Sequence, residues 1–207
     1  MIMINILTRT SNRPNFFKIN YESVKNQILP ENVQINHIVS YDTDETEEYL
    51  KEYDDIIKVK ITRLEKTIQN TFPYNLYFNE MLKYVKTGYI IYLDDDDTLY
   101  SNDSISKIIN YLIEDSILLW RVINKNETLY PTDYHFNKKQ ISPNDFPINC
   151  FSYHTKWIDK IEWKGMKGGD YNYGIRLYKI INKIKTLNEI ICRIGNVGMG
   201  YQKDIKK

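Results

Sequence analysis

Residues 89–97 have the sequence Tyr89-Ile90-Ile91-Tyr92-Leu93-Asp94-Asp95-Asp96-Asp97, in which a short apolar run ends in four consecutive aspartates. An apolar run of this length is typical of a buried β-strand. Four adjacent carboxylates repel one another, and a turn that caps a following helix needs only one or two of them. Because they directly follow the predicted strand, we expect at least two of them to lie in a ligand site. A solvated acidic turn is the alternative.

The segments around this strand alternate between apolar runs and helical periodicity. Pro14 suits the first turn of a helix. One face of that helix would consist of Phe17, Tyr21, Val24 and Ile28. Other helices are expected at 74–86, 105–112 and 170–181, and other strands at 3–7, 33–40, 56–61, 117–122 and 190–194. This alternation predicts an α/β fold with a mostly parallel central sheet and helices on both faces.

Polar residues follow three of the predicted strands. They are residues 8–12, Asp42 and the four aspartates at 94–97. The carboxyl ends of parallel strands lie at one edge of a sheet, and ligands bind beyond that edge. We therefore expect these three groups to converge on one rim.

The composition is that of a soluble globular protein, with 207 residues, 42% apolar and 27% charged. Lys and Arg total 28 against 27 Asp and Glu, and this balance argues against a nucleic-acid partner. Neither a signal peptide nor a membrane span is expected from the N-terminal sequence. Cys150 and Cys192 fit no disulfide framework or zinc spacing, so we expect buried thiols in a cytoplasmic protein. The length favours one domain over residues 1–207.

The acidic segment matches motifs of two enzyme classes. Asp94-x-Asp96 is the DxD pattern of nucleotide-sugar glycosyltransferases, whose carboxylates bind a divalent cation. Asp94-x-Asp96-x-Thr98-Leu99 also matches the first motif of haloacid-dehalogenase-type phosphatases, with Asp94 as nucleophile and Asp96 as general acid/base. The phosphatase needs a downstream Gly-Asp-x-x-x-Asp motif, and the candidate at Asp170 has Gly174 in the last position. This disfavours the phosphatase but keeps it as an alternative.

Taken together, these motifs resemble the inverting GT-A glycosyltransferases of the family-two type, including small viral glycosyltransferase domains. The resemblance covers nearly the whole chain. It rests on residues 6–14, 39–42, 92–97, 168–171 and 195–200. It implies a single-domain nucleotide-diphospho-sugar transferase fold, with a nucleotide-binding half at 1–100 and an acceptor and catalytic half at 101–207.

The resemblance also implies a role for individual residues of the nucleotide-binding half. Thr8 and Thr10 would line the base and ribose, and Arg13 would lie near the base or phosphates. Asp42 would accept a hydrogen bond from a uracil N–H, which favours a UDP-sugar donor. Arg63 would lie along the base or diphosphate.

The resemblance also implies which residues contact the ribose, bind the metal and act as the catalytic base. Asp94 and Asp95 would lie near the ribose, while Asp96 would bind Mn²⁺ or Mg²⁺, with Asp94 and His154 as further candidate ligands. Asp170 would be the catalytic base, with helix capping as its alternative role. Gly169 departs from the family, which has a Glu there, and this puts the geometry toward the acceptor in doubt.

The implied function is a metal-dependent transfer, with inversion, of a sugar from a nucleotide diphosphate to a hydroxyl acceptor such as a glycan. The cation would offset the charge on the leaving diphosphate. Asp170 would remove the proton of the acceptor hydroxyl. A flexible C-terminal tail is also expected, either as a glycine-rich lid at 195–200 with Lys203 reaching the diphosphate or as a merely disordered end. A non-catalytic sugar-nucleotide-binding module is the other alternative, although binding alone requires no base.

Overall fold

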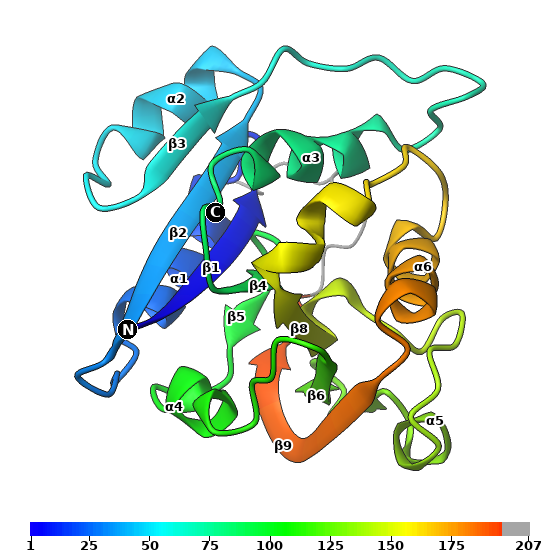
Figure 1. Ribbon diagram of the computed structural model, residues 1–207. Helices are drawn as coiled ribbons and strands as arrows, with labels where there is room; N and C mark the ends of the chain where they lie inside the picture. The colour runs from blue at the N-terminus through cyan, green and yellow to red at the C-terminus, as the bar shows by residue number, and fades with distance from the viewer. Residues whose placement is uncertain (196–207) are drawn as a thin grey trace.

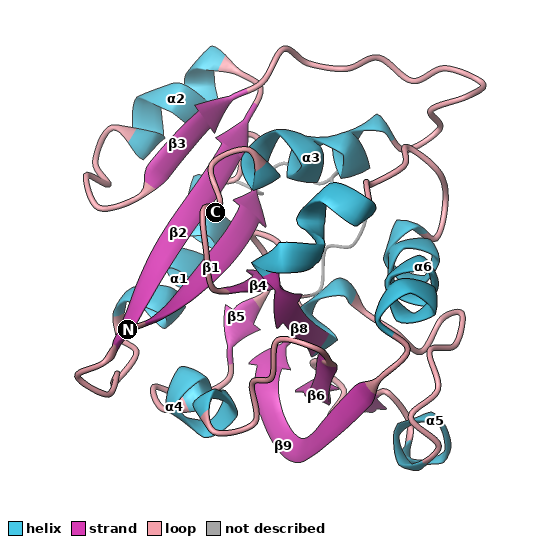
Figure 2. Ribbon diagram, viewed as in Figure 1, coloured by secondary structure: helices cyan, strands magenta, loops and turns pink. Residues whose placement is uncertain are grey.

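Nine strands form one sheet in the part of the chain that the computed structural model describes, residues 1–195 (Figures 1 and 2). The strands are β1 Ile2–Arg9, β2 Val33–Tyr41, β3 Ile57–Lys60, β4 Tyr89–Tyr92, β5 Thr98–Leu99, β6 Ile117–Ile123, β7 Leu129–Tyr130, β8 Phe151–His154 and β9 Ile184–Arg193. The α-helices are α1 Pro14–Lys25, α2 Asp44–Leu50, α3 Tyr77–Leu82, α4 Ser104–Ile109, α5 Asp133–Asn137 and α6 Gly169–Ile181. Short 3₁₀ helices occupy Pro73–Leu76, Ile148–Cys150 and Thr155–Lys160. The predicted lid beyond Gly195, and Lys203, lie outside the described residues.

The first half of the chain forms the parallel part of the sheet. β1 pairs in parallel with β2 and β4, and β2 pairs in parallel with β3. Residues 4–8 of β1 are buried without alternation, as expected for a central strand that is covered on both faces. In Figure 1, α3 lies beside the carboxyl ends of β1 and β2, and α1 lies behind these strands. The predicted α/β class, with a mostly parallel sheet between helices, is confirmed.

The second half departs from simple strand–helix alternation. β8, which was not predicted, lies antiparallel between β4 and β6. β9 begins six residues earlier than the predicted strand at 190–194, pairs in parallel with β6, and then pairs antiparallel with β5. Figure 1 shows how the curvature of β9 allows it to contact both strands. The first part of this strand was not predicted, because polar residues at 185, 186, 188 and 189 interrupt the apolar pattern.

The helices begin close to where the sequence predicts, but three of them end earlier, among them the helix predicted at 105–112, which ends as α4 at Ile109. α1 ends at Lys25, so Ile28 lies beyond it and is 68% exposed, contrary to the prediction. The buried face of α1 contains Phe17, Asn20 and Val24. The polar Asn20 in this face is explained by its contacts with the acidic turn, described below. The helix predicted at 74–86 is a 3₁₀ turn followed by α3, which ends at Leu82.

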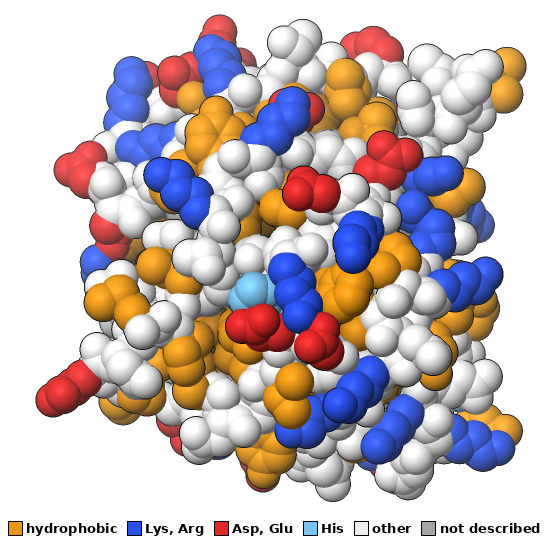
Figure 3. Space-filling view, viewed as in Figure 1, with side chains coloured by type: hydrophobic (Ala, Val, Ile, Leu, Met, Phe, Trp, Pro, Cys, Tyr) orange, Lys and Arg blue, Asp and Glu red, His pale blue; other side chains and the backbone are white. Residues whose placement is uncertain are grey.

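The charged side chains and the two cysteines lie as the composition predicts. Acidic and basic side chains are interspersed on the face shown in Figure 3, with more Lys and Arg toward its lower right. Cys150 and Cys192 are buried and free, as predicted. Across residues 1–195, every helix is too short or too polar to cross a lipid bilayer.

Candidate active site

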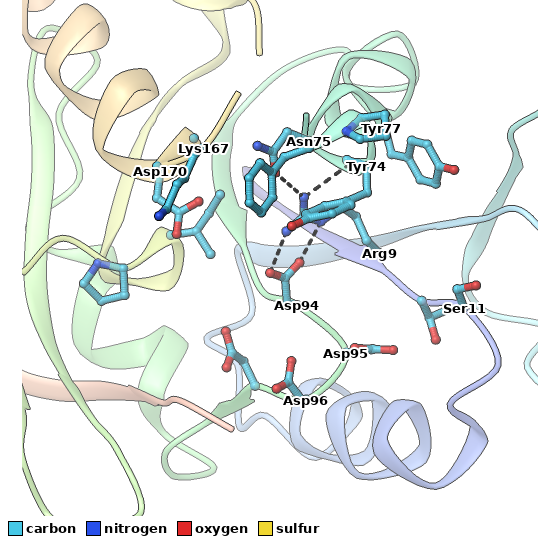
Figure 4. A pocket seen from close by; sticks show the side chains of 18 of the residues that line it. Arg9, Ser11, Tyr74, Asn75, Tyr77, Asp94, Asp95, Asp96, Lys167 and Asp170 are labelled. Carbon is cyan, nitrogen blue, oxygen red and sulfur yellow. Dashed lines mark hydrogen bonds and ion pairs between the residues drawn. The ribbon is translucent and has the colours of Figure 1, made fainter. Parts of the chain in front are cut away.

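A cavity of about 900 Å³ opens beyond the carboxyl ends of β1, β2 and β4, and the start of α6 forms its opposite wall (Figure 4). Most of the predicted site residues line it. They are Thr10, Arg13, Asp42, Arg63, Asp94, Asp95, Asp96 and Asp170. The convergence of three strand ends on one rim is therefore confirmed, and Thr8 and His154 are the two predicted residues that the cavity does not include.

Thr8 lies beneath the site. Its side chain is fully buried, and its hydroxyl donates to the carbonyl of Leu93 at 2.8 Å and lies 2.9 Å from Nε2 of His37. These partners hold β1 against β4 and β2. The expected contact of Thr8 with a nucleotide is thus replaced by a structural role, whereas Thr10, just beyond the strand end, reaches the cavity.

His154 lies at the other end of the sheet. In the antiparallel pair β4–β8 it is opposite Tyr89, the first residue of β4. Asp94 follows the opposite end of that strand, five residues on, which at the usual rise of a strand corresponds to about 16 Å. Nε2 of His154 is instead 3.8 Å from Glu114. The prediction that His154 ligates a metal with Asp96 is therefore wrong, because the antiparallel pairing of β8 was not foreseen.

The four aspartates form a turn that the surrounding structure holds in place. The backbone N–H of Asp97 donates to the carbonyl of Asp94 at 2.9 Å. The side-chain amide of Asn20 donates to the carbonyl of Asp94 at 3.0 Å and to that of Asp97 at 2.9 Å. A buried amide with two such acceptors fixes the backbone and so determines where each carboxylate points.

Asp94 is held by Arg9, which is not among the predicted site residues. Nε of Arg9 donates to Oδ1 of Asp94 at 2.9 Å, and Nη2 donates to Oδ2 at 2.7 Å (Figure 4). The guanidinium also lies 4.1 Å from the ring centroid of Phe78. Such a bidentate ion pair fixes both side chains more firmly than a single hydrogen bond does. The only signal in the sequence is the basic residue between Thr8 and Thr10.

Asp95 and Arg13 form a buried pair in the wall of the cavity. Nη1 of Arg13 is 2.8 Å from Oδ1 of Asp95, which is 1% exposed. Burial raises the pKa of Asp95 to about 8, against the opposing effect of Arg13. Nε and Nη2 of Arg13 and Oδ2 of Asp95 are buried without a hydrogen-bond partner among the described residues. Buried polar atoms of this kind carry a desolvation cost, which the contact between Arg13 and Asp95 offsets only in part.

Asp96 and Asp97 have different surroundings. Asp96 lines the cavity, with Oδ1 3.5 Å from Nη2 of Arg13. The buried carboxylate of Asp97 accepts from the side-chain amide of Asn149 at 2.9 Å and from the backbone N–H of Gly195 at 2.9 Å. Burial raises the pKa of Asp97 well above its ordinary value. Asp97 therefore ties the turn to the second half of the chain, and Asp96 faces the ligand space.

Asp42 lies at the other end of the cavity, at the end of β2. Oδ1 accepts from the hydroxyl of Ser11 at 2.7 Å, and Oδ2 accepts from the hydroxyl of Tyr77 at 2.8 Å. Nε of the exposed Arg63 is 3.9 Å from Oδ2. Ionised carboxylate oxygens can accept more than one hydrogen bond each, so Asp42 keeps the capacity to accept from a ligand.

Asp170 is the second residue of α6 and faces the acidic turn across the cavity (Figure 4). Burial raises the pKa of its carboxyl to about 6, and Asp94 acts in the same direction, whereas Arg9 and the backbone of Ile148 oppose the shift. A carboxylate with this pKa is ionised at neutral pH and is more basic than an ordinary Asp. Those two properties suit a general base.

The donor set fits a divalent cation that shares its coordination with a substrate. Within residues 1–195, three or more His, Cys, Asp or Glu side chains do not gather as a ready-made metal site. Mg²⁺ is commonly bound by one or two carboxylates together with substrate phosphates. Asp96, in the cavity wall, provides such a carboxylate. Asp94 lines the same wall, and both of its oxygens accept from Arg9.

The comparisons with known proteins agree with this geometry. The model of the family described as Glycosyl transferase family 2 matches residues 6–177. A search of curated proteins finds no match to the chain.

Among solved structures, TarS 1–349 of S. aureus in complex with UDP-GlcNAc is similar at a TM-score of 0.66 and 16% identity, covering 96% of this chain and 60% of that one. A longer structure of S. aureus TarS has a TM-score of 0.66 and 15% identity, covering 94% and 37%. The mannosyltransferase PcManGT from Pyrobaculum calidifontis, in complex with GDP-Man and Mn²⁺, has a TM-score of 0.68 and 11% identity, covering 96% and 58%.

These structural likenesses show the GT-A fold, and the present chain spans 37% to 60% of the length of these three chains. The family match runs from β1 into α6 and includes every element that carries a site residue. This chain belongs to glycosyl transferase family 2.

Proposed function

We propose that this chain is a metal-dependent inverting glycosyltransferase that moves a sugar from a nucleotide diphosphate, with UDP favoured, to the hydroxyl of an acceptor such as a glycan. One observation carries the proposal. Asp96 and Arg13 line one wall of a cavity, and the basic carboxylate of Asp170 faces them from the opposite wall. The first wall suits a charged leaving group, and the second suits the removal of a proton.

The nucleotide would lie along the rim formed by β1 and β2. Asp42 is placed to accept from a base N–H, and Thr10 and Arg63 line the same part of the cavity. The guanidinium of Arg13 in the same wall would add positive charge near the ribose and the phosphates. The similar structures of TarS with UDP-GlcNAc and of PcManGT with GDP-Man support a nucleotide-sugar donor for this chain.

Asp96 would hold Mn²⁺ or Mg²⁺ together with oxygens of the diphosphate. When bound, such an ion offsets the negative charge that develops on the leaving diphosphate. The Mn²⁺ in the PcManGT complex supports this assignment. Arg13, 3.5 Å from Asp96, keeps this carboxylate oriented along the cavity wall.

Asp170 would accept the proton of the acceptor hydroxyl as that oxygen attacks the anomeric carbon. In the same step the bond between the anomeric carbon and the diphosphate oxygen breaks, and the electron pair leaves with the nucleotide. Because base and leaving group lie on opposite sides of the sugar, the configuration at this carbon inverts. A single carboxylate suffices for this step.

The two alternatives are less consistent with the site. A phosphatase requires Asp94 as a free nucleophile, whereas both of its oxygens are bound by Arg9, and family membership also argues against that activity. A module that only binds sugar nucleotides would not require a carboxylate of raised basicity facing the donor site.

A ligand screen tests the proposed function. Thermal unfolding would be recorded with UDP, GDP and dTDP, each with and without Mn²⁺, and nucleotide release from UDP-GlcNAc and GDP-Man would be measured in parallel. A ligand at 100 times its Kd stabilises by about 2.7 kcal/mol, so binding is readily detected. We expect the largest shift with UDP and Mn²⁺, together with slow release of the nucleotide from its sugar donor. The absence of any Mn²⁺-dependent shift and of any release would contradict the proposal.

A further inference from the structure

We infer that Asn75 is a positioning residue that, together with Arg9, fixes the base Asp170 at its distance from the donor site. This inference rests on the proposed function, because it gives Asn75 a role in the same reaction. It also accounts for Gly169, which precedes the base.

Asn75 connects the two walls of the cavity through one side-chain amide. Its Oδ1 accepts from Nη1 of Arg9 at 3.0 Å, and its Nδ2 donates to the carbonyl of Met166 at 3.1 Å. Arg9 is the residue that holds Asp94 at the end of β4. Met166 lies in the loop that leads into α6, four residues before Asp170. A continuous chain of polar contacts therefore runs from the acidic turn to the segment that carries the base.

This connection is rigid. Asn75 is 5% exposed, and its backbone N–H donates to the carbonyl of Phe72 at 3.2 Å within the turn that precedes α3. Arg9 also donates to the carbonyl of Tyr74 at 3.3 Å and packs on the ring of Phe78. At the other end, the backbone N–H of Phe72 donates to the carbonyl of Gly165 at 2.9 Å and holds the residue next to Met166.

Gly169 lies directly against this amide. A Cβ atom at position 169 would lie 2.4 Å from Nδ2 and 3.0 Å from Cγ of Asn75, closer than real side chains approach. The preceding Gly168 has a φ of 66°, in the left-handed region, and sets the angle at which the chain enters α6. The space that a side chain at 169 would need is therefore filled by Asn75, and the two residues form one fitted contact.

The consequence for the reaction concerns distance rather than charge. The acceptor hydroxyl must lie between Asp170 and the anomeric carbon, so the base has to be held relative to the donor. A displacement of about 1 Å can reduce a rate by about 10²-fold. Loss of the Asn75 connection should therefore lower kcat while the affinity for the nucleotide, bound on the other wall, changes little.

The test uses Asn75→Ala and the near-isosteric Asn75→Asp, which keeps an acceptor for Arg9 but loses the donor to Met166. The matched control is Asn79→Ala. Asn79 also bridges to the second half of the chain, with Nδ2 donating to the carbonyl of Trp163 at 3.0 Å and Oδ1 accepting from its N–H at 2.7 Å. It does not line the cavity of the active site. Each variant is assayed for melting temperature, for the Kd of UDP with Mn²⁺, and for the kcat of nucleotide release from UDP-GlcNAc or GDP-Man, with water as acceptor.

We expect both Asn75 variants to lose about 10- to 100-fold in kcat with a Kd within about threefold of wild type. Asn79→Ala should lower the melting temperature and retain its kcat. Gly169→Ala should lower kcat in the wild-type background and add little to the loss in Asn75→Ala, because the steric conflict is then removed. If Asn75→Ala does not fold, Asn75→Asp answers the same question.

Three results would overturn the inference. They are a normal kcat in both folded Asn75 variants, an equal loss of kcat in Asn79→Ala, and additive losses in the Gly169→Ala and Asn75→Ala pair. In each of these cases the wild type is active and the proposed function stands. A wild type that releases nucleotide from neither donor would instead overturn the proposed function, and this inference with it.

Discussion

The side-chain amide of Asn20 donates to the carbonyl oxygen of Asp97 at 2.9 Å, from the middle of α1 to the end of the acidic turn. The same amide donates to the carbonyl of Asp94, so one buried side chain fixes both ends of the turn. This contact explains why a polar residue lies in the otherwise apolar face of α1. It also connects α1 to the turn that lines the cavity, although no residue of that helix was predicted to be functional.

Replacement of Asn20 should therefore affect both stability and ligand binding. In Asn20→Ala, one buried and one partly buried carbonyl lose a donor, and we expect a loss of about 1–3 kcal/mol in the free energy of unfolding. Denaturant titration measures this loss, and calorimetry should show weaker Mn²⁺-dependent binding of UDP. Tyr21→Phe, on the same helix, removes only an exposed bond to Asp55 and is the control, with an expected change below about 1 kcal/mol. Unchanged stability and affinity in Asn20→Ala would show that the acidic turn keeps its conformation without this side chain.

Asp170→Asn separates catalysis from binding. The amide has nearly the same shape as the carboxylate but is not basic, and we expect transfer to fall by about 10²–10⁴-fold. The fold should persist, because Asp and Asn are comparable at the start of a helix. Titration with UDP on the same preparation should give a Kd close to that of wild type. Near-normal turnover would remove Asp170 from the mechanism.

The pH dependence of kcat/KM should report the same group. The pKa of Asp170 is raised to about 6, mainly by burial. A base acts in its deprotonated form, so kcat/KM should fall about tenfold per unit below pH 6 and level off above it. The profile would be recorded between pH 4.5 and 8 with wild type and Asp170→Asn. An inflection near pH 6 that persists in the variant would assign it to another group.

Asp42 should determine the preference for the base. Asp42→Ala should weaken UDP binding by about 1–3 kcal/mol, since a base N–H in the site would then lack an acceptor. Tyr77→Phe removes one of the two hydroxyls that orient Asp42 and should have a smaller effect in the same direction. Calorimetric titrations with UDP and GDP would be compared for each variant. Equal losses for the two nucleotides would mean that Asp42 does not contact the base.

Much of the candidate site could be predicted because its position follows a simple rule of parallel sheets. Asp42 follows β2 and Asp94 follows β4, and both strands pair in parallel with β1. Once the strands are recognised, both carboxylates are therefore expected at the same edge of the sheet. Apolar runs made those strands visible. The role of Thr8 was predicted wrongly because a residue near the end of a strand can point to either face of the sheet. The side chain of Thr8 contacts His37 on the adjacent strand, β2, which the sequence pattern does not reveal.

The contacts between the two halves could not be predicted in this way. The contact of Asn75 with Arg9 and Gly169 joins the end of β1, a 3₁₀ turn and the start of α6. Its geometry depends on how these elements pack, which no local pattern specifies. His154 was misplaced for a related reason, because β8 is short and its antiparallel pairing with β4 is set by the tertiary structure.

The central claim is that Asp96 holds a divalent cation that binds with the nucleotide. Isothermal titration of UDP into wild type and Asp96→Asn, each with and without Mn²⁺, tests it most directly. We expect wild type to bind UDP at least tenfold more tightly with Mn²⁺ than without it. Asp96→Asn should keep its melting temperature and lose this dependence on Mn²⁺. Equally tight, Mn²⁺-dependent binding of UDP to Asp96→Asn and to wild type would contradict the account.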